Sequence, residues 1–170
     1  MNDGMEERDR ARRVLYRSCD ILNRVCWQGA LPPCLLTLSF RMSPRTMAYA
    51  RPELRGEYPR IVFNARCCRN MGDADFLQLM AHEMIHIRQF SLGGRGGHGK
   101  DFQDEQRRLG LILGAVIPED SPFGYVLFMH GLRMLHPAEA VRILAANPDG
   151  LRADKKFFTD NRDDMSHSYA

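Results

Sequence analysis

The sequence lacks the patterns that place a protein in a membrane or direct it out of the cell. Its 170 residues contain no apolar run long enough to cross a bilayer. The first residues are polar, with Glu6, Glu7 and Arg8 standing where a signal peptide would have its apolar stretch. We therefore expect an intracellular, cytoplasmic protein without a membrane partner.

Cysteine is scarce, and its spacing matches no disulfide framework. None of the five cysteines belongs to a CxxC pair, the usual mark of a cysteine-based zinc site. Reduced thiols are therefore expected, as in most cytosolic proteins. A ligand role for the adjacent Cys67 and Cys68 stays open, beside the more common role of free cysteine as a small packed hydrophobe.

No strong excess of one charge sign is present either. The net charge of +3 and the sequence pI of about 8.7 fall short of a strong nucleic-acid footprint. Arginine is nevertheless concentrated near the start, where Arg10, Arg13, Arg17 and Arg24 would project together from a helix spanning about residues 6–27. Such a stripe could follow phosphates, although a solvated helix face is the commoner meaning.

Three short segments after this first helix predict β-strands. They are Leu36–Phe40, Met47–Ala50 and Arg60–Asn64, with turn residues between them. Helical patterns follow, among them a segment that begins with Pro137 and continues to Ala146. Strands first and helices after predict an α+β fold without a βαβ repeat. The length and the 44% apolar content suit one domain with a sizeable core.

The most informative stretch is His82–His86, which reads HExxH inside an apolar, helix-periodic run. We expect this helix to span Ala74–Leu92, with Asp73 as its N-cap and Gly93-Gly94 at its end. Residues four apart share one helix face, so both imidazoles would point at one spot, where Zn²⁺ could bind. Glu83 could then serve as general base toward a metal-bound water that attacks a peptide carbonyl. The simpler alternative is two helix histidines without a metal.

A catalytic zinc ion needs a third protein ligand and one open position. The metzincin pattern would place a histidine six residues after His86, where Leu92 stands, so that class is excluded. His98 is the leading candidate, because a glycine-rich turn before it would fold the chain back and Phe102 would anchor the following helix. Glu105 remains the competing ligand, since carboxylates also bind zinc.

HExxH followed by Gly97-His98-Gly99 and Phe102 resembles the SprT-like (Spartan-type) zinc metalloproteases, whose pattern is HExxH, a variable loop and GHGxxF. The resemblance covers about residues 35–113, including the three strand segments. It implies three zinc ligands, His82, His86 and His98. It also implies that Glu83 is the catalytic acid/base of a zinc-dependent endopeptidase acting on protein substrates.

The chain departs from that family in one respect. Many members carry a zinc ribbon of paired CxxC motifs after the protease core, and this chain has none. The segment at about 114–170 is therefore expected to be a partly helical extension of the same domain. Cleavage of proteins crosslinked to DNA, which in the family depends partly on accessory regions, stays a possibility. Arg95 and Lys100 flank His98 and could meet nucleic acid or an acidic substrate segment.

A second class of function stays open, a non-enzymatic module in which zinc stabilises a fold that binds a protein or nucleic acid. Glu83 favours the enzyme, because a structural zinc closed by four ligands needs no base. Several other polar residues could serve the site or serve only structure: Asp101, Asp104, Tyr125, His130 and His136. The two aspartates would be acceptors for a ligand imidazole, or else caps or solvated groups.

Overall fold

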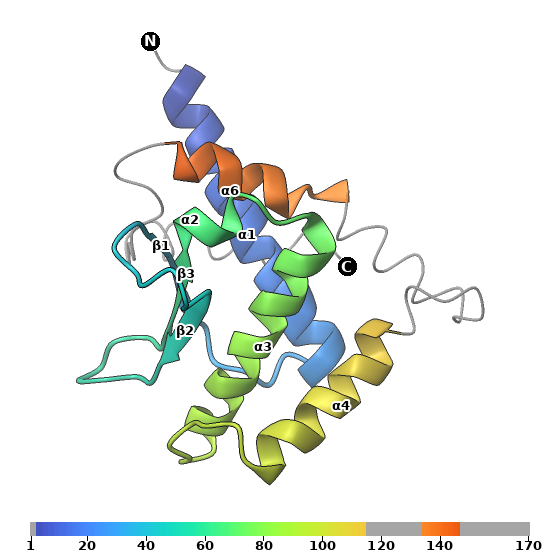
Figure 1. Cartoon of the computed structure of the whole chain (residues 1–170). Coiled ribbons are helices and arrows are strands. Elements are labelled where there is room, and N and C mark those ends of the chain that lie inside the picture. Colours follow the sequence, from blue (N-terminus) through green and yellow to red (C-terminus); the bar gives the residue numbers. More distant parts are fainter. Residues whose placement is uncertain (1–2, 115–133, 147–170) are drawn as a thin grey trace.

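The computed structural model of the chain describes residues 3–114 and 134–146. In chain order the elements are helix α1 (Asp3–Trp27), strands β1 (Leu35–Ser39), β2 (Ala48–Arg51) and β3 (Arg60–Asn64), and helices α2 (Ala65–Cys68), α3 (Asp73–Ser91), α4 (Lys100–Gly114) and α6 (Pro137–Ala145). Figure 1 shows the expected α+β arrangement of an N-terminal helix, a small sheet and several helices after it. No described helix is long and apolar enough to cross a membrane. Tyr125, His130 and most of the predicted extension lie outside the described residues.

The three strands form one mixed sheet in the order β1-β3-β2. Strand β1 pairs in parallel with β3, whereas β2 pairs with β3 in the antiparallel direction. Strand β2 therefore ends the sheet on one side, and among the described strands none pairs with its outer edge. The three predicted strands are confirmed, with the first two displaced by one residue from the predicted bounds.

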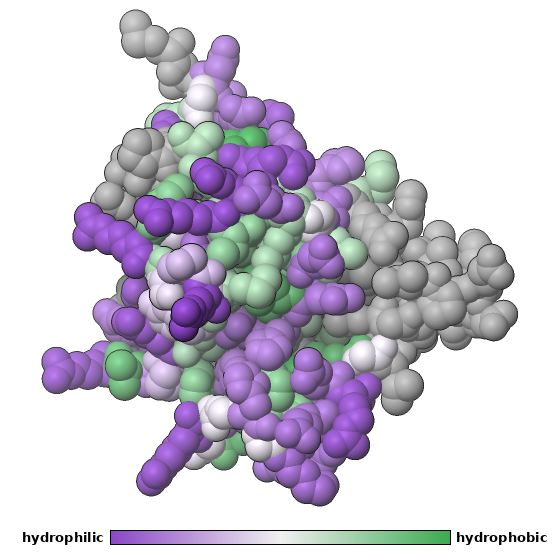
Figure 2. Space-filling view, viewed as in Figure 1, coloured by the Kyte–Doolittle hydropathy of each residue, from purple (hydrophilic) through white to green (hydrophobic). Residues whose placement is uncertain are grey.

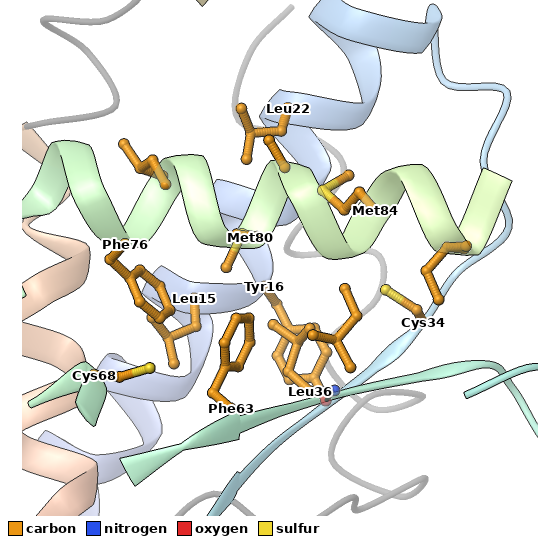
Figure 3. Packing of buried hydrophobic residues seen from close by; sticks show 14 of the residues in the cluster. Leu15, Tyr16, Leu22, Cys34, Leu36, Phe63, Cys68, Phe76, Met80 and Met84 are labelled. Atoms are coloured by element: carbon orange, nitrogen blue, oxygen red, sulfur yellow. Dashed lines mark hydrogen bonds between the residues drawn. The ribbon is translucent and has the colours of Figure 1, made fainter. Parts of the chain in front are cut away.

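Helix α3 crosses the core and packs against both α1 and the sheet. Phe76, Met80 and Met84 on α3 are fully buried, and Phe76 lies beside Leu15 of α1 and Phe63 of β3 (Figure 3). The rings of Phe63 and Phe76 have their centroids 5.0 Å apart. Burial of these large apolar side chains fixes the rotation of α3 about its axis. That rotation determines where the polar residues of HExxH emerge.

Helix α4 is amphipathic and packs against α3. Phe102 and Leu109 are buried in the core cluster, while hydrophilic side chains cover the outer face of α4 (Figure 2). Because Phe102 and Leu109 are about two helical turns apart, they lie on one face of α4, and this face packs against α3. This packing places the loop before α4 next to the centre of α3.

The start of α3 differs from the prediction. Asp73 was expected to be the N-cap, but Gly72 occupies that position and Asp73 is the first helical residue. Oδ1 of Asp73 instead accepts a hydrogen bond of 2.8 Å from the backbone N–H of Ala138, in the first turn of α6. The carboxylate thus caps a helix distant in sequence, which begins at Pro137 as predicted. The short helix α2 was not predicted.

The end of α3 agrees with the prediction. Gly93 has a φ of 81°, the left-handed conformation that glycine adopts without strain. The N–H of Gly93 bonds to the carbonyl of Phe90, and the N–H of Gly94 bonds to the carbonyl of Gln89. This pair of bonds is the Schellman motif, which ends the helix and turns the chain back toward it.

Candidate metal centre

Three histidines converge on one point between α3 and the loop that precedes α4. His82 and His86 lie one turn apart on α3, and His98 lies just before the first residue of α4. One ring nitrogen from each lies within 4.8 Å of the other two, and Nε2 of His98 is 3.2 Å from Nε2 of His82. Within the described part of the chain, no other cluster offers three potential metal donors.

The spacing and the donor set fit a zinc ion. Zn–N bonds of roughly 2.0–2.1 Å in a tetrahedral site place two ligand nitrogens about 3.3 Å apart. The 3.2 Å between the nitrogens of His98 and His82 is close to that value. Three imidazoles leave a fourth position open, which is the arrangement of catalytic rather than structural zinc. The residues present therefore suit a zinc ion with one free coordination position.

Phe102 forms an apolar floor beneath the three imidazoles. Its ring centroid lies 4.8 Å from that of His82, 4.7 Å from that of His86 and 4.6 Å from that of His98. The side chain is 1% exposed, so it is held firmly by the core. Contact with all three rings restricts their rotation and keeps water from one side of the cluster. This explains why a phenylalanine stands four residues after His98.

Two glycines let the loop approach the helix closely enough to deliver His98. Gly96 and Gly97 have φ values of 81° and 100°, in the left-handed region. A Cβ on Gly96 would lie 3.0 Å from Cε1 of Phe90. Other residues at these positions would therefore strain the backbone or displace the ring.

Gln89, a residue that the sequence did not point to, connects His86 with the loop residue just before His98. Its Oε1 lies 2.8 Å from Nδ1 of His86, and its Nε2 donates to the carbonyl of Gly97 at 3.1 Å. A carbonyl can only accept, so the amide nitrogen must face Gly97 and the amide oxygen must face His86. Nδ1 of His86 is then the donor, which leaves Nε2 unprotonated and free to bind a metal. The only sequence signal was a polar residue one turn after the motif.

Burial favours the neutral form of His82 and His86, which is the form that binds metals. It lowers the pKa of His82, and the charges of His86 and His98 lower it further. Burial also lowers the pKa of His86, and the charge of His98 adds to this, against the opposing effect of the hydrogen bond with Gln89. Both rings are therefore deprotonated at neutral pH, as metal ligation requires.

Glu83 lies beside the cluster at the wall of a groove. Its side chain is 4% exposed, and burial raises the pKa of its carboxyl to about 7. A carboxyl of that pKa can both accept and release a proton near neutral pH. The groove has a volume of about 770 Å³ and is lined by Glu83 and His82 from α3 and by Met47 and Ala48 from the start of β2.

The profile of the SprT-like family matches residues 15–119. The chain belongs to the SprT-like family. Its match begins in α1 and takes in the whole sheet, α3 and α4, so it is wider than residues 35–113. Neither the curated proteins nor the solved structures give a match. Membership of the SprT-like family indicates a metalloprotease-type domain, and the three histidines could hold its metal ion.

Glu105 does not approach the metal centre of this SprT-like domain. Its carboxylate accepts hydrogen bonds from Trp27 and Arg108, and Arg88 lies 4.0 Å from it. The alternative in which Glu105 supplies the third ligand would require these contacts to break. Of the two candidates for a third ligand, His98 is the one that the structure groups with His82 and His86.

The polar residues considered beside the ligands have other surroundings. Asp104 pairs with Lys100 at 2.7 Å and with Arg107 at 3.3 Å, and Asp101 is exposed in the first turn of α4. The hydrogen bond to a histidine of the cluster is made by Gln89, not by Asp104. His136 is exposed and has left-handed backbone at the N-cap of α6.

The basic residues fall into two groups. Arg95 and Lys100 are exposed next to His98 and line a second groove of about 780 Å³ between the end of α3 and α4. The other four lie along α1: Arg10, Arg13, Arg17 and Arg24. None of these four lines either groove, and Arg24 is ion-paired with Asp20 at 3.1 Å. The structure therefore brings only Arg95 and Lys100 to the histidines.

Proposed function

We propose that this SprT-like protein is a zinc-dependent endopeptidase that hydrolyses peptide bonds of protein substrates. The observation that carries the proposal is the convergence of three imidazole nitrogens within 4.8 Å beside a buried carboxyl group, at the wall of a groove of about 770 Å³. A groove of this volume is open enough for a segment of polypeptide. Membership of the SprT-like family supports the same activity.

Each residue of the site has a defined task in this proposal. His82, His86 and His98 would hold the zinc ion, which when bound supplies a Lewis acid that polarises the carbonyl and activates water. Glu83 accepts a proton from the attacking water and passes it to the nitrogen of the leaving amine. Phe102 and Gln89 keep the imidazoles in place, so little reorganisation is needed during the reaction.

The sheet edge offers a way to bind an extended substrate. Ala48, the first residue of β2, and Met47 just before it line the groove, and the outer edge of β2 has no strand partner among the described residues. A peptide in extended conformation can hydrogen-bond to such an edge irrespective of its side chains. Backbone pairing there would lay the peptide beside His82 and Glu83.

We also propose that the substrates include proteins associated with DNA, and that the enzyme works in the reducing setting of the cytoplasm. Arg95 and Lys100 lie beside the metal centre and are exposed, so they can contact phosphates next to a bound protein. All five cysteines are free thiols, which supports a reducing compartment. The competing function, a non-catalytic zinc module, would require a fourth protein ligand, and the described residues group only three.

The decisive experiment compares the parent protein with Glu83→Gln. Both are loaded with zinc and incubated with unfolded casein, with and without DNA. We expect Glu83→Gln to keep zinc and fold but to lose cleavage by roughly 10²–10⁴-fold, the usual contribution of general acid–base catalysis. Glu53→Gln, at an exposed loop position, is the matched control and should cleave like the parent. Equal cleavage by Glu83→Gln and the parent would refute the peptidase, and a zinc-loaded parent that cleaves nothing would favour the binding module.

A further inference from the structure

A second, smaller pocket opens beside the metal centre, between α3 and α4. Its volume is about 210 Å³, and its lining consists of Gln78, Ala81, His82, Ile85, Gln106, Leu109 and Gly110. It shares Gln78, His82 and Gln106 with the groove that contains Glu83. A peptide in that groove would therefore pass the mouth of the pocket at His82, where the bond is to be cleaved.

The lining of the pocket selects against charge. Ala81, Ile85 and Leu109 are buried and apolar, and apart from His82 no lining residue carries an ionisable group. A charged side chain entering here would lose hydration, and none of the side chains that line the pocket offers it an opposite charge, which is unfavourable. An apolar side chain would instead remove apolar surface from water.

The size of the pocket matches one side chain. An apolar cavity of about 150 Å³ is known to accept benzene, whereas sites for whole small-molecule ligands start at about 300 Å³. At about 210 Å³ this pocket lies between these two sizes. Leucine, methionine and phenylalanine side chains would fill it, and alanine would leave most of it empty.

Gly110 gives an independent indication that the pocket is kept open. It lies inside α4, where glycine is the least favourable residue after proline. Packing does not require it, because a Cβ at this position would meet no atom within 4 Å, and its φ is not positive. A larger residue here would stabilise the helix but would extend from the wall of the pocket. Gly110 is exposed, so it lies at the mouth of the pocket, and without a side chain it leaves that mouth open.

We propose that this pocket is a specificity subsite, which takes an uncharged apolar side chain of leucine, methionine or phenylalanine size from the substrate residue next to the cleaved bond. The inference rests on the proposed peptidase function. In this inference, Ile85, Leu109 and Gly110 determine which substrate side chain is accepted. The groove along β2 binds the backbone of the substrate.

The first test measures cleavage preference with the zinc-loaded full chain and a mixed peptide library analysed by mass spectrometry. We expect leucine, methionine and phenylalanine to be enriched at one position next to the cut, and aspartate and lysine to be depleted. Gly110→Leu should reduce the preference for leucine over alanine by on the order of tenfold or more, while cleavage of alanine peptides continues. Arg107→Leu adds the same side chain to α4 outside the pocket and should leave the preference unchanged. An unchanged preference in Gly110→Leu would overturn the subsite and leave the peptidase standing.

The second test needs no turnover. The zinc-loaded Glu83→Gln protein, with labelled isoleucine and leucine methyl groups, is titrated with acetyl-Gly-Leu-Gly-amide and with its alanine and aspartate counterparts. We expect the methyl signals of Ile85 and Leu109 to shift with the leucine peptide, to shift much less with the alanine peptide and to stay unchanged with the aspartate peptide. Equal shifts for all three peptides, or none, would overturn the subsite even if the protein proves inactive as a peptidase.

Discussion

Trp27, at the end of α1, donates a hydrogen bond of 2.8 Å from its indole nitrogen to Oε1 of Glu105 in α4. Arg108 binds the same carboxylate and also donates to the backbone carbonyl of Cys26 at 2.7 Å. The bond from Trp27 to Glu105 and the bond from Arg108 to Cys26 fix the end of α1 to α4, the helix that follows His98. Glu105, the alternative candidate for the third ligand, thus helps to hold α4 in place. The position of His98 depends on α4, because His98 lies just before it.

Glu105→Gln should destabilise the protein by about 2 kcal/mol at neutral pH, because a charged hydrogen-bond acceptor is lost. Burial acts to raise the pKa of Glu105, but hydrogen bonds from Arg108 and Trp27 and the charges of Arg108 and Arg88 outweigh it and lower the pKa below 4.5. The folded state therefore holds this proton less tightly than the unfolded state. The stabilisation is present above pH 4.5 and is lost as the pH falls through the lowered pKa.

Urea unfolding of the parent and Glu105→Gln at neutral pH and near pH 3 would measure this difference. We expect the gap in free energy of unfolding to shrink in acid. Glu53→Gln, at an exposed position, should show little gap at either pH. A gap that stays constant across this range would show that the ionised carboxylate is not what stabilises the fold.

Gln89→Ala should weaken zinc binding by roughly 10–100-fold, the usual effect of removing a partner that orients a ligand histidine. The variant loses both the acceptor for His86 and the donor to the loop at Gly97. Gln89→Glu keeps the acceptor and loses only the donor, so it should bind zinc more tightly than Gln89→Ala. Competition against a chromogenic chelator gives both affinities, and Ser91→Ala, exposed in the same turn, serves as the control. Parent-like affinity in Gln89→Ala would contradict the role.

The choice of third ligand can be tested by elemental analysis of protein purified without added metal. We expect about one zinc per chain in the parent and a large loss in His98→Ala, because only two imidazoles remain. Glu105→Ala should keep its zinc, although it should unfold more easily. The opposite pattern, with zinc lost from Glu105→Ala and kept by His98→Ala, would show that the assignment of the ligand is wrong.

Binding to DNA, if it activates the enzyme, should be weak, independent of sequence and strongly dependent on salt, because it would rest on phosphate contacts and counterion release. The double variant Arg95→Ala/Lys100→Ala should bind more weakly than the parent if the contacts lie at the metal centre. Arg10→Ala/Arg13→Ala tests the stripe on α1 instead. Fluorescence anisotropy with labelled single- and double-stranded oligonucleotides at low and physiological salt measures both. Absence of binding at low salt would indicate a protease that works without DNA.

Much of the site could be predicted because its signals are local. The spacing of His82 and His86 in an apolar helical run determined that both rings share a face, since the period of a helix is fixed by backbone geometry. Gly93 and Gly94 marked the end of that helix for a similar reason, because few other residues adopt a left-handed backbone. The three strands could also be predicted, because short apolar segments between turn residues are typical of strands.

Contacts between distant residues decided the rest, because sequence patterns report local periods and not which segments meet. Asp73 caps the helix that begins at Pro137, and that helix is placed only by packing. Gln89 reaches His86 on its own helix and Gly97 only because the loop folds back. The buried pairing of Glu105 with Trp27, the order of the sheet and the pocket between α3 and α4 likewise exist only once the core has formed. Local patterns in the sequence predicted the histidines, Glu83 and the helix that carries His82 and His86, because the period of a helix is a local property. Tertiary packing decided which side chains contact them and where the grooves beside them lie, because it brings together residues that are far apart in the chain.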